Sequence, residues 1–215
     1  MSNKAVFLDR DGVINPLVYN PATGEYESPH KPEDFLLYPF AEKSLRLLKD
    51  AGFIITVVSN QPSYAKGKTS LENIKAVEKT LEDFSAEHGG LIDKSFYCYH
   101  HPNGIVPEYT RSCACRKPGT LFLEQAKTEF NLDPAQCWFT GDRDSDIECG
   151  RRFGCRTIKI DNPHSAKNSG CIEADYHAKN LFDAAKIIVE YTASKNYMER
   201  RQTNDTRRVH TAVFA

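Results

Sequence analysis

Short apolar runs and amphipathic stretches alternate along most of the chain. Short apolar runs bounded by polar or glycine-containing segments are typical of strands buried on both faces of a sheet, and longer amphipathic stretches are typical of helices. This alternation predicts an α/β fold, a Rossmann-like open parallel sheet covered by helices on both faces. We expect strands at residues 5–8, 53–58, 94–99, 137–140 and 156–160, and helices at residues 41–50, 120–130, 145–152 and 181–191.

Local signals place a further helix and a long loop. Gly52 follows the segment 41–50 and is typical of a helix end. Thr69 and Glu72 have the spacing of a capping box, which predicts a helix that begins there and runs to about residue 87. Residues 16–34 are polar and irregular, so we expect a long loop between the first strand and the first helix.

Length, charge and cysteine content narrow the class of protein. The chain has 215 residues and a formal net charge of -1, without the basic excess typical of nucleic-acid binding. No apolar stretch approaches membrane-spanning length, and Asp9 comes too soon to leave room for a signal peptide. We therefore expect a cytoplasmic, monomeric enzyme that binds neither nucleic acid nor membranes, with a domain at residues 1–194 and a tail at residues 195–215. Its seven cysteines are expected to be thiols or metal ligands.

Two carboxylates follow the first expected strand directly. Asp9 and Asp11 are two residues apart, so in extended chain they project to the same side, toward the crevice where α/β sheets bind ligands. Phosphoryl transfer can use such a pair, because one acid must stay ionised as nucleophile while the other moves protons. A divalent cation would keep the first acid ionised and screen its repulsion from a phosphate. The alternative is an ordinary strand followed by a tight turn, which Asp and Gly also favour.

The segment FLDRDGVIN resembles the first motif of the haloacid dehalogenase-like phosphohydrolases. Their other three motifs have counterparts in the expected order: Ser59 after a strand, Lys117 within CRKP, and Asp142 within GDRDSD. The resemblance implies that Asp9 forms an aspartyl-phosphate and that Asp11 is the general acid and base. It also implies that Ser59 and Lys117 hold the phosphoryl oxygens.

The same resemblance implies a catalytic magnesium ion. Its expected ligands are Asp9, the backbone carbonyl of Asp11, and Asp142, since magnesium prefers oxygen ligands. Asp146 lies one helical turn beyond Asp142 and is expected outside the direct ligands. It could equally be an ordinary acid in the first turn of a helix.

A second group of residues has the composition of a metal site. Cys98, His100, Cys113 and Cys115 offer three thiols and an imidazole, a set that suits tetrahedral zinc. The alternative is scattered free cysteines beside an exposed histidine. A closed four-ligand site would order the loop 98–115 over the active site, where there is little hydrophobic burial to do so.

The four zinc-ligand candidates resemble the zinc clamp of heptose bisphosphate phosphatases and of histidinol-phosphate enzymes. In both families zinc is structural and the reaction uses magnesium. The resemblance implies that Arg116, next to the phosphate-binding lysine, selects substrate by gripping a second anionic or hydroxyl-bearing group. By the same resemblance Asn60 and Gln61 orient the substrate or the loop, and Arg143 contacts substrate or steadies the carboxylates.

Three functions remain open at this point. The first is a magnesium-dependent phosphatase of a small sugar phosphate, most specifically the C7 phosphate of a heptose 1,7-bisphosphate. The second is a phosphatase of histidinol phosphate or of another small phosphomonoester. The third is a zinc-ordered binding protein without catalysis, which the intact acidic motifs disfavour. The long segment between His100 and Cys113 resembles the heptose branch.

Overall fold

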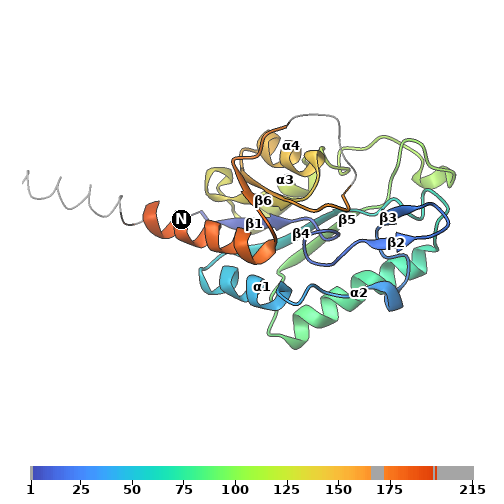
Figure 1. Ribbon diagram of the computed structural model, residues 1–215. Coiled ribbons are helices and arrows are strands. Elements are labelled where there is room, and N and C mark those ends of the chain that lie inside the picture. The colour runs from blue at the N-terminus through green and yellow to red at the C-terminus, as the bar shows by residue number, and fades with distance from the viewer. Residues whose placement is uncertain (1, 166–171, 196, 198–215) are drawn as a thin grey trace, which may run out of the picture.

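The computed structural model describes residues 2–165, 172–195 and 197 (Figure 1). It contains a six-stranded sheet in which every neighbouring pair of strands is parallel. In sheet order the strands are β5 (Lys94–Cys98), β4 (Ile54–Asn60), β1 (Ala5–Leu8), β6 (Trp138–Gly141), β7 (Arg156–Ile160) and β8 (Tyr176–Ala178).

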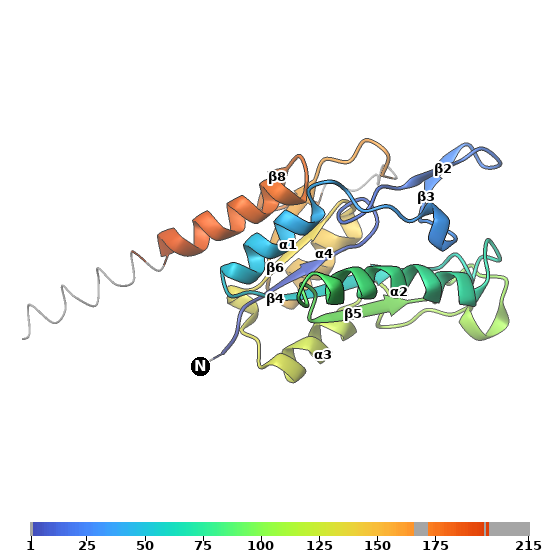
Figure 2. The same ribbon diagram turned by 90° about the horizontal axis from the view of Figure 1, so that it is seen from below.

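Helices cover both faces of this sheet (Figures 1 and 2). One face packs against α1 (Ala41–Asp50), α2 (Leu71–Glu87) and a helix at residues 181–195. The other face packs against α3 (Leu121–Phe130) and α4 (Asp144–Phe153). The predicted open parallel sheet with helices on both faces is therefore confirmed.

Strand β1 lies in the middle of the sheet and is buried along its whole length. Its side chains alternate between the two layers, as strand geometry requires. Val6 and Leu8 join the core on the α1 and α2 side, whereas Phe7 packs against Phe139 and Phe153 on the other. Because β1, β4 and β6 are parallel neighbours, the residues that follow them emerge at the same edge of the sheet.

The expected elements agree with the structure to within two residues at most boundaries, and the structure adds three strands. Residues 16–34, expected as loop, contain an antiparallel hairpin of β2 (Val18–Asn20) and β3 (Glu25–Glu27). Strand β8 was not expected from the sequence. Short 3-10 turns lie at Pro32–Asp34, Pro107–Tyr109 and Pro134–Gln136.

The predicted cap of α2 was wrong by one residue. Ser70, not Thr69, precedes the helix, and its hydroxyl accepts a hydrogen bond from the backbone N–H of Asn73 at 3.2 Å. The Thr69 hydroxyl instead donates to the backbone carbonyl of His30 at 2.6 Å. Thr69 therefore ties the start of α2 to the segment that follows the β2–β3 hairpin.

Three cysteines outside the expected zinc set are buried, namely Cys137, Cys149 and Cys155. Among the described residues no helix is long and apolar enough to cross a membrane. The tail from residue 198 onward lies outside the described residues, so the boundary between 194 and 195 stays a prediction, as does the monomeric state.

Candidate active site

A polar cavity of about 230 Å³ opens at the carboxyl edge of the sheet. It contains every predicted catalytic and substrate-contacting residue except Gln61, which lies behind Asp11. Ser28, from the segment after β3, lines this cavity and also a neighbouring cavity of about 490 Å³ that is lined by the hairpin and by residues at the start of α2. The lining residues are Asp9, Asp11, Ser28, Ser59, Asn60, Arg116, Lys117, Arg143, Ser145 and Asp146.

Lys117 forms a buried ion cluster at the base of this cavity. Its ammonium lies 2.8 Å from Oδ1 of Asp9 and 2.7 Å from Oδ1 of Asp146, and all three side chains are almost fully buried. Burial alone would lower the pKa of Lys117, but the two carboxylates outweigh it and raise that pKa. Burial raises the pKa of Asp9, and the neighbouring acids raise it further while Lys117 opposes them.

Asp146 is therefore no ordinary acid of a first helical turn. It is wholly buried at the start of α4, and its Oδ2 accepts a hydrogen bond from the backbone N–H of Arg143 at 3.0 Å. Gly141 leaves the space for it, because a Cβ there would lie 2.2 Å from the Cβ of Asp146. In the sequence, Asp146 was noticed only for its spacing from Asp142. That spacing does not distinguish a buried partner of Lys117 from a solvated acid.

Asp142 approaches the first motif closely at a glycine. A Cβ on Gly12 would lie 2.0 Å from Oδ2 of Asp142, and Gly12 has φ +89°, which side chains rarely adopt. Asp142 is 4 % exposed, and its Oδ1 has no hydrogen-bond partner among the described residues. Burial, together with the negative charges of Asp9 and Asp146, raises the pKa of Asp142 to about 7.

The acidic cluster fits a hard divalent cation. Asp9, Asp142 and Asp146 each offer a carboxylate oxygen, and the three oxygens lie within 4.8 Å of one another. Buried carboxylates at this spacing repel one another unless positive charge or protons compensate them. A magnesium ion, which prefers oxygen ligands, would supply such charge, and the free Oδ1 of Asp142 is available to bind it.

Asp11 is held by a different set of partners. The Nε and Nη2 atoms of the wholly buried Arg10 donate to its two oxygens at 3.0 and 3.1 Å. Gln61 donates to Oδ2 at 2.6 Å, and Asn15 donates to Oδ1 at 3.0 Å. Burial raises the pKa of Asp11, but Arg10 and the two amides outweigh it, so that the net pKa is lowered.

Arg10 and Asn15 were not singled out from the sequence, although both lie inside the first motif. The signal that could have identified Arg10 is its position between two acids, at the exit of a buried strand. The Arg10 guanidinium lies over the rings of Phe35 and Tyr97, which explains how it is accommodated in the interior.

Asn60 and Gln61 connect the motif residues to one another. Asn60 Oδ1 accepts a hydrogen bond from the backbone N–H of Lys117 at 3.0 Å, and its Nδ2 donates to the Lys117 carbonyl at 3.2 Å. Gln61 Nε2 donates to Ser59 Oγ at 3.0 Å as well as to Asp11. Asn60 therefore fixes the backbone of Lys117, and Gln61 joins the end of β4 to the first motif.

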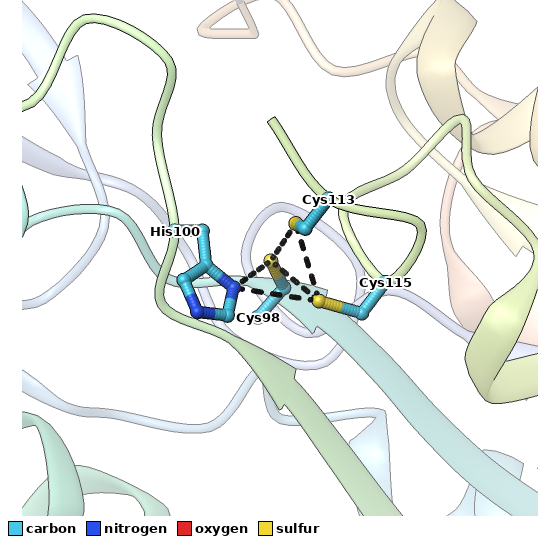
Figure 3. Close-up of side chains that lie close together, drawn as sticks. All are labelled: Cys98, His100, Cys113 and Cys115. Atoms are coloured by element: carbon cyan, nitrogen blue, oxygen red, sulfur yellow. Dashed lines mark hydrogen bonds between the residues drawn. The ribbon is translucent and has the colours of Figure 1, made fainter. Parts of the chain in front are cut away.

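The four predicted zinc ligands lie together beside the active site (Figure 3). The Sγ of Cys98 is 3.6 Å from that of Cys113 and 3.4 Å from that of Cys115, and Cys113 and Cys115 are 3.2 Å apart. The Nδ1 atom of His100 is 3.7 Å from Cys98 and 3.5 Å from Cys115. Bonds of about 2.3 Å to sulfur in a tetrahedron place ligand atoms roughly 3.5–3.8 Å apart. The observed separations of 3.2–3.7 Å lie within this range or slightly below it, so the spacing and the donor set suit zinc.

The cysteine cluster is directly connected to the catalytic edge. Cys98 ends β5, and its carbonyl accepts a hydrogen bond from the backbone N–H of Gln61 at 2.7 Å. Cys115 precedes Arg116 and Lys117 in the chain. Arg116 is partly buried, and its Nη1 donates to the carbonyl of His100 at 3.4 Å. Ordering of this loop therefore orders two of the cations that line the cavity, Arg116 and Lys117.

Comparisons with known proteins show which family this chain resembles. Residues 114–184 match the family model described as HAD-hydrolase-like. The D-glycero-alpha-D-manno-heptose-1,7-bisphosphate 7-phosphatase of Photorhabdus laumondii is 34% identical over 188 residues, 86% of this chain and 96% of the relative. The D-glycero-D-manno-heptose-1,7-bisphosphate 7-phosphatase of Chlorobaculum tepidum is 34% identical over 192 residues, 85% of this chain and 92% of the relative.

A solved structure is similar over nearly the whole fold. It is the D,D-heptose 1,7-bisphosphate phosphatase from B. bronchiseptica complexed with magnesium and phosphate, with a TM-score of 0.71 and 22% identity. The similarity covers 88% of this chain and 99% of that chain. At this identity the likeness supports the fold, while the similarity to the two relatives above supports the family.

Proposed function

Because this chain belongs to the haloacid dehalogenase-like hydrolases, in the family of the heptose-1,7-bisphosphate 7-phosphatases, we propose that it hydrolyses the C7 phosphate of a D-glycero-D-manno-heptose 1,7-bisphosphate. The observation that carries this proposal is the position of Asp9. Asp9 directly follows the central strand β1, and its carboxylate lies 2.8 Å from the Lys117 ammonium, in a cavity that Ser59 and Arg116 also line.

In the proposed reaction Asp9 is the nucleophile. One of its oxygens forms a bond to phosphorus as the bond from phosphorus to the sugar oxygen breaks, and an aspartyl-phosphate results. Lys117 and Ser59 hold the phosphoryl oxygens, where negative charge develops. Water then attacks the phosphorus of the intermediate, which releases inorganic phosphate and restores the Asp9 carboxylate.

Asp11 moves the proton in both steps. It protonates the departing sugar oxygen and later accepts a proton from the attacking water. Arg10 and Gln61 favour its ionised form, which suits the second step. A bound phosphate places negative charge beside Asp11 and so favours its protonated form, which suits the first step. Substrate binding would thereby favour protonated Asp11 before the sugar oxygen departs.

We propose that magnesium is bound by Asp9, the backbone carbonyl of Asp11, and Asp142. When bound, magnesium neutralises charge on the phosphate and on the surrounding carboxylates. The free Oδ1 of Asp142 supports this assignment. We propose that Asp146 acts mainly through Lys117, since its Oδ1 is 2.7 Å from that ammonium.

We propose that zinc, held by Cys98, His100, Cys113 and Cys115, has a structural role. A zinc ion with four protein ligands has no open coordination position and would order the loop that carries those ligands. The support is the mutual spacing of the four ligand atoms and the position of Cys115 next to Arg116.

Arg116 and Arg143 are the proposed contacts for the rest of the substrate. Both guanidinium groups line the same cavity as Asp9, and Arg143 helps to lower the pKa of Arg116, after burial itself. Two neighbouring cations suit a substrate with a second phosphate. Asn60 and Gln61 are proposed to act on substrate through the positions they impose on Lys117 and Asp11.

A substrate panel tests this function. Purified protein is assayed for phosphate release with both anomers of heptose 1,7-bisphosphate, heptose 7-phosphate and histidinol phosphate, with and without added magnesium. We expect the highest kcat/KM for a 1,7-bisphosphate, release from C7, and dependence on magnesium. A higher kcat/KM for histidinol phosphate would assign the chain to the alternative function.

A further inference from the structure

The residues that follow β7 lie against the acidic cluster. The hydroxyl of Ser165 donates to Oδ2 of Asp142, and Asn162 Nδ2 lies 3.3 Å from the same oxygen. Asn162 Nδ2 also lies 3.4 Å from the backbone carbonyl of Gly12. These side chains therefore contact the two acidic motifs from a third segment of the chain.

The two oxygens of Asp142 consequently have different surroundings. Oδ2 is occupied by Ser165 and Asn162, whereas Oδ1 is buried without a partner among the described residues. Such an arrangement fixes the rotation of the carboxylate and leaves one oxygen for a cation. Groups that hydrogen-bond a metal-binding carboxylate in this way set its orientation.

We infer that Ser165 and Asn162 are positioning residues for Asp142, which they hold with one oxygen directed to the metal site. The inference rests on the proposed function, because it requires Asp142 to bind a divalent cation. Neither side chain lines the catalytic cavity, so both act through Asp142 rather than on substrate.

The segment that carries these two residues is attached to the β2–β3 hairpin. The ring of His164 stacks on that of Tyr26, with centroids 3.8 Å apart and an angle of 23° between the planes. Asn162 Oδ1 accepts a hydrogen bond from the backbone N–H of His164 at 3.0 Å. Because His164 is exposed, this stack provides a specific contact for a segment with little burial of its own.

The position of Asp142 therefore depends on the hairpin as well as on α4 and β6. Tyr26 belongs to β3, and Ser28, two residues later, lines the catalytic cavity. Loss of the stack should weaken cation binding less than loss of the Ser165 hydroxyl, since His164 acts through the backbone and Ser165 contacts Asp142 directly.

The test is the affinity of the zinc-loaded protein for Mn²⁺, measured by electron paramagnetic resonance of free Mn²⁺ in the absence of substrate. Loss of a group that orients a metal ligand costs about 10–100-fold in metal affinity. We expect Ser165→Ala and Asn162→Ala to raise the Kd for Mn²⁺ about 10-fold. Ser165→Thr, which keeps the hydroxyl, should stay within about 3-fold of the wild type.

His164→Ala is compared with His177→Ala, which removes a half-exposed histidine from β8. We expect His164→Ala to raise the Kd for Mn²⁺ about 3-fold and His177→Ala to leave it unchanged. Thermal unfolding of each zinc-loaded variant is recorded without added Mn²⁺ or Mg²⁺ and should lie close to that of the wild type, because these residues are not core residues.

Asp142→Asn separates the inference from the proposed function. If Asp142→Asn weakens Mn²⁺ binding strongly while Ser165→Ala and Asn162→Ala bind like the wild type, the positioning role is refuted and the metal site stands. An equal loss in Ser165→Thr and Ser165→Ala would also refute it, since the hydroxyl would then have no part. If Asp142→Asn leaves binding unchanged, both the proposed metal site and the positioning role are refuted.

Discussion

Lys117 and Asp146 form an ion pair in the interior of the protein, with 2.7 Å between Nζ and Oδ1 and side-chain exposures of 2% and 0%. They come from different segments, since Lys117 follows the cysteine loop and Asp146 lies in the first turn of α4. Lys117 also contacts Asp9, so one ammonium compensates two buried carboxylates. Both acids depend on it, because a buried charge without a partner is strongly destabilising.

We predict that Lys117→Met lowers the free energy of unfolding by roughly 3–5 kcal/mol at pH 7 in zinc-loaded protein without added magnesium. The substitution keeps the volume of the side chain but leaves Asp9 and Asp146 without their cation. Denaturant unfolding measures the effect. Lys94→Met, which breaks an exposed pair with Glu129, should cost at most about 1 kcal/mol. Equal losses in the two variants would contradict the prediction.

Substitution of Arg116 should separate two kinds of substrate. In Arg116→Ala we expect kcat/KM to fall about 10–100-fold for the heptose bisphosphate, in line with loss of one charge-assisted contact. For an aryl phosphate, which has no second phosphate, the loss should be under about 3-fold. Steady-state kinetics give kcat/KM for both substrates. Arg152→Ala, which changes an exposed arginine, is the control. A similar loss on both substrates would mean that Arg116 does not select substrate.

Zinc content and stability should change together in the cysteine cluster. We predict that Cys113→Ser loses bound zinc and unfolds at a lower temperature than the wild type. The kcat of the protein that remains folded should be affected less than its thermal stability. Elemental analysis and thermal unfolding measure the two effects. Cys155→Ser, a buried cysteine of the core, should keep the wild-type zinc content. If elemental analysis finds no zinc in purified wild-type protein, the proposed site is contradicted.

Glu78 should make stability depend on pH. It lies on the inner side of α2, accepts a hydrogen bond from the hydroxyl of Tyr99 at 2.8 Å, and burial raises its pKa to about 7. A carboxyl whose folded pKa is raised favours folding below its unfolded pKa of about 4.5 and loses this contribution as pH rises through the folded pKa.

Glu78→Gln removes the titration and keeps an acceptor for Tyr99. Relative to this variant, the wild type should lose on the order of 2 kcal/mol of stability between about pH 4.5 and pH 8. Denaturant unfolding of both proteins across this range gives the difference. A difference that does not change with pH would show that Glu78 keeps an ordinary pKa.

Much of the catalytic edge could be predicted because its residues lie at the ends of buried strands or directly after them. Asp9, Ser59 and Asp142 each stand beyond an apolar run, and parallel strands bring the ends of such runs to one edge. The cysteine cluster was predictable from ligand chemistry together with the family resemblance, since three cysteines and a histidine are a donor set that suits tetrahedral zinc. Both predictions used information that is local in the sequence.

The remaining parts of the site depend on contacts between distant segments. Asn162 and Gly12 are in contact although they are 150 residues apart in the sequence. Tyr26, which stacks on His164, belongs to a hairpin whose sequence indicated only a polar loop. Burial of Asp146 depends on the place of Lys117, which the sequence does not fix. Residue types alone therefore indicated the chemistry, and the tertiary contacts decided which acids are buried and what holds them.

The central claim is that Asp9 carries the phosphoryl group. The protein is quenched during turnover of the heptose bisphosphate, treated with borohydride to reduce an acyl phosphate to the alcohol, and digested with trypsin. Cleavage after Lys4 and Arg10 separates Asp9 from Asp11. We predict homoserine at position 9, dependent on substrate and lost in Asp9→Asn, with Asp11 unchanged. Unmodified aspartate at position 9 during active turnover, or homoserine at position 11 instead, would contradict the account.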